Sequence, residues 1–118
     1  MKLWKWIHGR QEAEYSKLPL LLGKTFDFYL LKFPDKSSIP CHVDPVSSGL
    51  KHHRLNITVR SPCIGTGRFR CSGPYKSWLG GRIVYFRPDI YSHSLTTVDM
   101  MWSNESMYML SFGWVTRA

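Results

Sequence analysis

The segment IPCHVDPV, residues 39–46, places a histidine and an aspartate two positions apart. Side chains alternate in an extended strand, so His42 and Asp44 point to one face while Val43 points to the other. A third candidate, His93, follows the strand-like run RIVYF and a proline-containing turn. Two imidazoles and one carboxylate are the donors of a facial triad, which leaves open positions on a non-haem Fe(II) ion. We therefore take His42, Asp44 and His93 as candidate metal ligands.

The H-x-D spacing is weak evidence taken alone, because short motifs arise by chance and need a structural context. In the alternative interpretation, His42 only ends a strand, and Asp44 opens the turn DPVSSG through its side chain. Both interpretations remain open on spacing alone.

The elements that would position these residues are short strands. Runs of strand-forming residues at regular spacing are separated by turn-rich segments. Such a series is typical of an all-β double-sheet sandwich or jelly roll. Residues 1–18 are expected to form a short N-terminal helix or arm, and residues 19–118 the β domain. For residues 98–106, a loop and a continued hairpin both fit. The expected strands lie at 24–33, 40–43, 53–60, 67–72, 82–86, 93–97 and 107–115.

Length and composition limit the function classes. A chain of 118 residues forms one domain, and no stretch is long and apolar enough to cross a bilayer. The first ten residues lack the apolar core of a signal peptide, and the cysteines Cys41, Cys63 and Cys71 form no C-x-x-C pair. We expect a cytoplasmic protein with reduced thiols. The net charge of +8 favours an anionic partner or a small anionic cosubstrate, although a generally basic surface explains it equally well.

Five segments, taken in order, resemble the double-stranded β-helix of the Fe(II)- and 2-oxoglutarate-dependent oxygenases, a cupin-like jelly roll. The resemblance covers about residues 25–115, and it is closest to the aspartyl/asparaginyl β-hydroxylase type and to small stand-alone phage and bacterial oxygenases. It implies that His42, Asp44 and His93 hold Fe(II), with 2-oxoglutarate and O2 as cosubstrates. Many β-hydroxylases of this type lack the carboxylate ligand, so Asp44 indicates the full triad of the wider superfamily. The segments are FDFYLLKFPDKSSIPCHVDP, HHRLNITVRSP, GRFRC, GGRIVYFRPDIYSHSLT and YMLSFGW.

The sequence departs from this family on its last strand. In many members an arginine there binds the distal carboxylate of 2-oxoglutarate, because the guanidinium fork pairs with both carboxylate oxygens. Met107 and Tyr108 stand where that arginine is expected, and no Arg or Lys occurs between Arg87 and Val115. Another residue must hold this carboxylate, or 2-oxoglutarate is not the cosubstrate.

Substitutes for the missing arginine lie on the run HRLNITVR, residues 53–60. Arg54, Asn56, Thr58 and Arg60 share one face of an alternating strand. In the β-hydroxylase type, the position matching Arg54 also contributes to the cosubstrate site. We expect Arg54 first and Arg60 second as the clamp, with Asn56, Ser111 and Tyr29 as candidate hydrogen-bonding partners.

The resemblance implies an oxygenase that hydroxylates a substrate C–H bond while 2-oxoglutarate and O2 yield succinate and carbon dioxide. The substrate stays open between a protein side chain, an acidic peptide and a nucleic acid. The rival interpretation is a non-enzymatic jelly-roll module that binds nucleic acid or a partner protein through basic and aromatic residues. A metal-dependent barrel that uses a different organic acid, or none, is a third. Trp114, in LSFGWV, is expected in the core, and the adjacent His52 and His53 are expected in a solvated turn.

Overall fold

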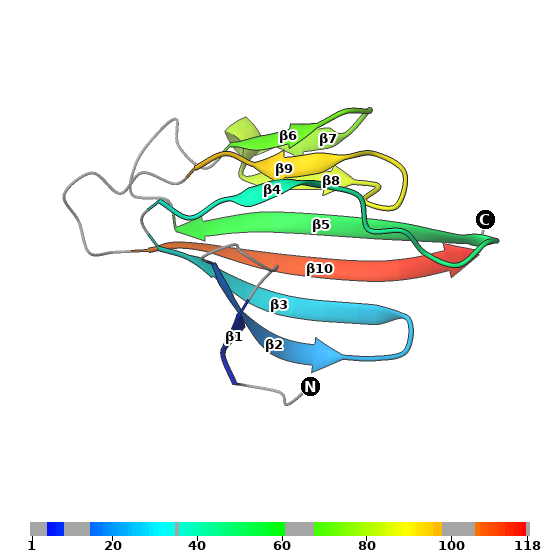
Figure 1. Ribbon diagram of the computed structural model, residues 1–118, viewed down its shortest axis with the longest axis horizontal. Helices are drawn as coiled ribbons and strands as arrows, with labels where there is room; N and C mark the ends of the chain where they lie inside the picture. The colour runs from blue at the N-terminus through cyan, green and yellow to red at the C-terminus, as the bar shows by residue number, and fades with distance from the viewer. Residues whose placement is uncertain (1–4, 9–14, 35, 61–67, 98–105, 118) are drawn as a thin grey trace.

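The computed structural model describes residues 5–8, 15–34, 36–60, 68–97 and 106–117. Within these residues the chain forms two antiparallel sheets (Figure 1). The large sheet has the order β1-β2-β3-β10-β5-β8-β7, and the small sheet has the order β4-β9-β6. The strands are β1 (Ile7–His8), β2 (Ser16–Leu22), β3 (Phe26–Phe33), β4 (Ile39–His42), β5 (Leu50–Arg60), β6 (Phe69–Cys71), β7 (Lys76–Trp78), β8 (Ile83–Phe86), β9 (His93–Leu95) and β10 (Met107–Arg117).

The long strands β3, β10 and β5 form the centre of the large sheet. Met109 pairs in register with Leu31 on β3 and with Thr58 on β5, so these side chains share the face that looks toward the small sheet. We call this the inner face. The alternation on β10 is strict, because Met107, Met109 and Ser111 are buried while the residues between them are not.

The core lies between the inner face and the small sheet. Phe33 has no exposed surface, and it stacks on Tyr15 with ring centroids 5.2 Å apart. Phe86 on β8 meets Phe69 on β6 at 4.6 Å, so this ring pair joins the two sheets directly. Burial of these large apolar side chains is the main source of stability for a sandwich of this kind. The buried cluster is completed by Leu31, Leu95, Met107 and Met109.

The jelly roll expected from the sequence is confirmed. The N-terminal helix is wrong for the residues that the structure describes: Ile7 and His8 form β1, which pairs with β2. The sequence did not indicate β2 because Pro19 interrupts it, and the pairing with β3 becomes irregular after this proline. β7 lies in a segment expected to be a turn. A 3-10 turn at Leu79–Gly81 is the helical segment of the described chain.

The remaining sequence expectations concern the cysteines, residues 98–106 and membrane-spanning segments. Cys41 and Cys71 are free thiols, and Cys63 lies outside the described residues. Of residues 98–106, for which a loop and a hairpin both stayed open, all but Ser106 also lie outside them. In the described part of the chain, no helix is long and apolar enough to span a membrane.

Candidate metal centre

The two candidate histidines come from one strand pair. His42 is the last residue of β4, His93 is the first residue of β9, and the two are partners in the antiparallel register. Asp44 follows β4 in a loop, and its backbone N–H donates to the carbonyl of Pro88 at 2.8 Å. The extended chain after His42 and the tie to Pro88 therefore direct the Asp44 carboxylate to the point that the two imidazoles share.

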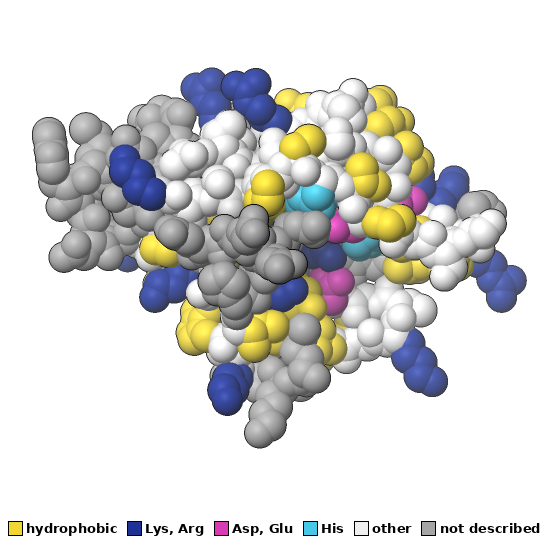
Figure 2. All heavy atoms as spheres, in the orientation of Figure 1, with side chains coloured by type: hydrophobic (Ala, Val, Ile, Leu, Met, Phe, Trp, Pro, Cys, Tyr) yellow, Lys and Arg dark blue, Asp and Glu magenta, His cyan; other side chains and the backbone are white. Residues whose placement is uncertain are grey.

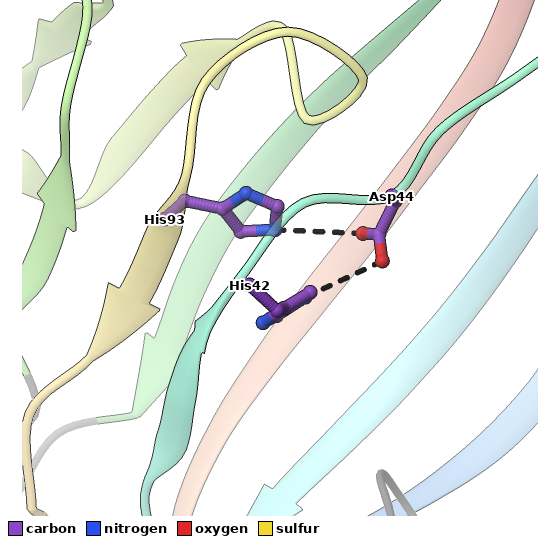
Figure 3. A group of neighbouring side chains, drawn as sticks. All are labelled: His42, Asp44 and His93. Carbon is purple, nitrogen blue, oxygen red and sulfur yellow. Dashed lines mark ion pairs between the residues drawn. The ribbon is translucent and has the colours of Figure 1, made fainter.

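The three side chains converge, as Figure 3 shows. His42 Nε2 lies 3.4 Å from one oxygen of Asp44, and His93 Nε2 lies 3.4 Å from the other. One ligand atom from each residue falls within a 4.8 Å group. The His93 side chain is 8% exposed and the Asp44 side chain 35%, so the cluster is enclosed on the His93 side and accessible on the Asp44 side.

Backbone carbonyls determine the tautomer of both histidines. His42 Nδ1 lies 2.6 Å from the carbonyl oxygen of Pro40, and His93 Nδ1 lies 3.1 Å from that of Tyr91. A carbonyl only accepts, so each Nδ1 carries the proton and donates it. The Nε2 lone pair of each neutral imidazole is then directed at Asp44, which is the arrangement that metal-binding histidines use.

The electrostatics of the cluster call for a cation. Burial by itself raises the pKa of the Asp44 carboxyl, but hydrogen bonds and positive charge from His42 and His93, when their imidazoles carry a second proton, hold that pKa well below its usual range. The carboxylate is therefore ionised at neutral pH. Two neutral imidazoles would place two further lone pairs against it, and three acceptors cannot satisfy one another. Either protons on the imidazoles or one bound metal ion resolves this conflict.

The donor set fits a divalent metal of the first transition row. Imidazole and carboxylate ligands in a 2-His-1-carboxylate set suit non-haem Fe(II). Two ligand atoms at ~2.1 Å from one ion and at right angles to each other lie about 3 Å apart. The two 3.4 Å separations at Asp44 are close to that value. A small inward movement of the side chains would complete the site.

A cavity of about 180 Å³ opens beside the triad and runs over the inner face of the large sheet. Figure 2 shows its mouth as a hollow in which histidine, acidic and cationic side chains meet. The wall opposite the triad carries the polar residues Arg54, Asn56 and Ser111, and Tyr29 lies beside them. The apolar side chains of Leu31, Ile39 and Phe86 also line the cavity.

Arg54 belongs to a half-buried polar network on this wall. Its Nη1 donates to Ser111 Oγ at 2.8 Å, and Ser111 donates onward to Asn56 Oδ1 at 2.6 Å. Its Nη2 donates to Asp27 at 2.9 Å and lies 3.4 Å from His52 Nε2. The structure thus brings three of the predicted cosubstrate residues together, and Asp27 already balances the charge of the guanidinium.

Two further residues of the cavity wall were not singled out from the sequence. Lys17 on β2 lines the cavity and lies over the Tyr29 ring, with Nζ 5.0 Å from the centroid. Tyr15 lines it as well. Both precede the segment that was expected to begin the β domain at residue 19. The sequence did contain a sign of the strand that carries Lys17: in KLPLLL, Lys17 and Pro19 alternate with Leu18.

The remaining candidates lie elsewhere. Arg60 is exposed at the far end of β5 and does not line the cavity that the triad opens into, so its position favours Arg54 as the clamp. His52 and His53 do face opposite sides of the sheet, as the alternation predicts, but they are half-buried residues of β5. The solvated turn expected for them is wrong, because β5 begins two residues earlier, at Leu50.

Known proteins resemble this chain in structure. No protein-family model matches it, and a search of curated proteins gives no sequence match. An RmlC-like cupin protein from Desulfovibrio desulfuricans superposes with a TM-score of 0.59 at 13% identity, covering 92% of this chain and 94% of that one. A prolyl-4-hydroxylase from Pseudomonas putida gives 0.55 at 15% identity over 79% of this chain and 52% of the hydroxylase. A DMSP lyase from Ruegeria pomeroyi gives 0.61 at 15% identity, over 93% and 55%.

The fold is therefore a cupin-like jelly roll. Identities of this size do not carry function across, because one fold hosts many chemistries. Enzymes are frequent among the neighbours, and a metal-competent His-His-Asp cluster stands in this chain.

Proposed function

We propose that this protein is an Fe(II)- and 2-oxoglutarate-dependent dioxygenase that hydroxylates a C–H bond of its substrate. The observation that carries the proposal is the convergence of His42, Asp44 and His93, with both Nε2 atoms facing the carboxylate. The polar wall that faces the triad across the cavity supports it. The prolyl-4-hydroxylase among the structural neighbours is consistent with such chemistry on this fold.

His42, Asp44 and His93 would hold the Fe(II), which supplies the activation of O2 and the oxidative decarboxylation of 2-oxoglutarate. The residues of the chain hold the reactants in place. The Nδ1–H donors of the two histidines to Pro40 and Tyr91 fix the imidazole planes. Ile39 and Phe86 line the cavity beside them and limit the access of water to the reacting centre.

The far carboxylate of 2-oxoglutarate would bind to Arg54, Ser111 and Lys17. Ser111 takes a bond from Arg54, and both line the cavity. Met107 and Met109, the inner-face residues of β10 before Ser111, are apolar, so this part of the inner face offers no cation. Lys17 supplies a second positive charge on the neighbouring wall. Asp27 pairs with Nη2 of Arg54, whereas Nη1 of Arg54 donates to Ser111. The two cations together replace the arginine missing from the last strand.

Anaerobic addition of Fe(II) and then 2-oxoglutarate to the metal-free protein tests this assignment. A visible charge-transfer band is expected, because a chelated keto acid on Fe(II) absorbs there. The band should be absent in His93→Ala and weak in Arg54→Ala. It should be unchanged in His53→Ala, which removes a histidine from β5, the strand of Arg54, but from its opposite face. Fe(II) binding without a band in the unaltered protein would overturn the assignment of 2-oxoglutarate and leave a metal site with another cosubstrate.

A further inference from the structure

The large sheet carries apolar side chains on both of its faces. On β10 the residues that point away from the core are Tyr108, Leu110, Phe112 and Trp114, and none of them is buried. The register places Phe28 and Leu55 on either side of Phe112. A sheet with one solvated face normally alternates apolar with polar residues. We call this second side the outer face. Its other large apolar residues are Leu18, Leu21, Phe26, Leu30, Ile57, Ile83 and Tyr85.

Five rings form a continuous band across four strands of the outer face. Phe28 on β3 meets Phe112 on β10 edge to face, with centroids 5.8 Å apart, and Phe112 lies 5.6 Å from Trp114. Trp114 stacks on His53 of β5 at 5.3 Å and 14°, and His53 stacks on Tyr85 of β8 at 5.9 Å. We call these five residues the aromatic band.

Trp114 is therefore not a core residue, contrary to the sequence expectation. Ser111 takes the inner position on β10, so the alternation turns Phe112 and Trp114 outward. Phe112 keeps 37% of its surface exposed, and Leu21, on the outer face of β2, keeps 50%. Exposed rings and leucines on one sheet face indicate an interaction surface.

We propose that the outer face is the interface of a symmetric homodimer, in which two copies of this chain pack their large sheets face to face. The face is larger than the apolar patch of a typical monomer and approaches the size of a stable interface. Five strands about 4.8 Å apart and about eight residues long cover roughly 650 Å². A stable interface buries about 800 Å² on each partner, whereas the largest apolar patch of a typical monomer is about 300–600 Å². A two-fold axis covers the same patch on both copies at once.

The distribution of charge also fits a protein interface. Lys32 pairs with Tyr108 near one end of β10, and Lys51 pairs with Thr116 near the other. Between these lysines, the outer-face positions of β3, β10 and β5 carry no Lys, Arg, Asp or Glu. An apolar centre with charges at the rim is the usual anatomy of an interface. Because the lysines stay at the rim, two copies of charge +8 can meet without burying a cation.

A second copy fits this face better than a single-stranded nucleic acid. A stacking platform needs ring faces open to the bases and cations beside them. In the aromatic band, His53 lies nearly parallel to Trp114 at 14° and to Tyr85 at 21°, so these ring faces are turned to each other. His53 is also anchored at both nitrogens, to the Tyr85 hydroxyl at 2.5 Å and to Thr116 Oγ1 at 2.8 Å. The band therefore presents ring edges and aliphatic groups, which pack well against another protein.

Sedimentation velocity of the full chain over a range of concentrations tests the proposal, which does not depend on the metal chemistry. The unaltered protein should sediment as a dimer, at twice 13.8 kDa. Phe112→Lys and Leu21→Lys should each weaken dimerisation at least about 30-fold. The first places a charge at the centre of the buried interface, and the second places one near its edge. The matched control is Ile90→Lys, which alters a residue 53% exposed in the loop between β8 and β9 and should leave the dimer intact. Circular dichroism verifies that each variant is folded.

Three results would overturn the proposal. The first is an unaltered protein that stays at 13.8 kDa at every concentration. The second is a dimer that both folded outer-face variants retain, since the contact would then lie elsewhere. The third is a monomer that binds a thymidine oligonucleotide and loses this binding in Phe112→Lys, which would assign the face to nucleic acid.

Discussion

His42 and His93 lie opposite each other in the register of β4 and β9, with ring centroids 4.2 Å apart. One antiparallel pair of short strands thus positions both imidazoles. The third ligand depends on a different contact, the bond from the Asp44 N–H to the Pro88 carbonyl. The loop between β8 and β9 therefore supports the triad from two sides, because it also leads into His93.

This loop is stabilised by an ion pair whose effect depends on pH. Arg87 donates to both oxygens of Asp89, at 2.9 and 2.7 Å, and Arg87 Nε also donates to the His52 carbonyl on β5. Burial by itself raises the pKa of Asp89, but the bonds from Arg87 and from backbone groups lower it below its usual value. A carboxyl with a lowered pKa in the folded state stabilises the protein above its unfolded pKa, and this contribution is lost as the pH falls through the folded pKa.

We predict that Asp89→Asn lowers the free energy of unfolding at pH 7 by about 1–3 kcal/mol, because Arg87 then loses a charged partner. The variant should also lose less stability than the unaltered protein when the pH is lowered from about 5 to about 3. Urea denaturation at several pH values measures both effects. Equal acid sensitivity in the two proteins would show that Asp89 is not held ionised by Arg87.

Gly113 lets Arg54 lie flat on β10. A Cβ at this position would overlap the Arg54 guanidinium and would lie 3.0 Å from Asp27 Oδ1. We predict that Gly113→Ala displaces Arg54 and weakens 2-oxoglutarate binding about 10-fold or more, at a cost of about 1–3 kcal/mol in stability. Fe(II) affinity should not change, since the triad lies on β4, on β9 and in the loop after β4. Calorimetric titration of each ligand separates the two effects, and a parallel loss of Fe(II) binding would contradict the account.

Lys17 gives a prediction specific to this chain. If its ammonium shares the far carboxylate with Arg54, Lys17→Met should weaken 2-oxoglutarate binding about 10-fold, and Lys17→Arg should retain most of it. The matched control is Lys24→Met, an exposed lysine in the turn after β2. Affinity for 2-oxoglutarate in the Fe(II)-loaded protein is the measurement. An unchanged affinity in Lys17→Met would leave Arg54 and Ser111 as the whole clamp.

Alternation in the sequence predicted those parts of the site that depend on a single strand. It placed His42 and Asp44 on one side and Val43 on the other, and Val43 is indeed exposed. It also grouped Arg54 with Asn56, and both line the cavity. The turn-rich segments between strands indicated the jelly roll for the same reason, since they reflect local geometry.

The parts that depend on pairing between distant strands could not be predicted. Asp27 and Arg54 meet only because β3 and β5 both pair with β10, and Gly113 stands between them in the register. Alternation relates Trp114 to Ser111, but it does not say which of them faces the core. Lys17 was not predicted as a site residue, because Pro19 lies inside β2 and makes this strand difficult to recognise from the sequence.

Anaerobic calorimetric titration of the metal-free protein with Fe(II) tests the central claim, that His42, Asp44 and His93 together form the metal centre. We predict one ion per chain. His42→Ala and His93→Ala should each weaken binding at least about 100-fold, Asp44→Ala should weaken it clearly, and His53→Ala should match the unaltered protein. Fe(II) binding that persists unchanged in His42→Ala and His93→Ala would contradict the account, because the ion would then lie at another site.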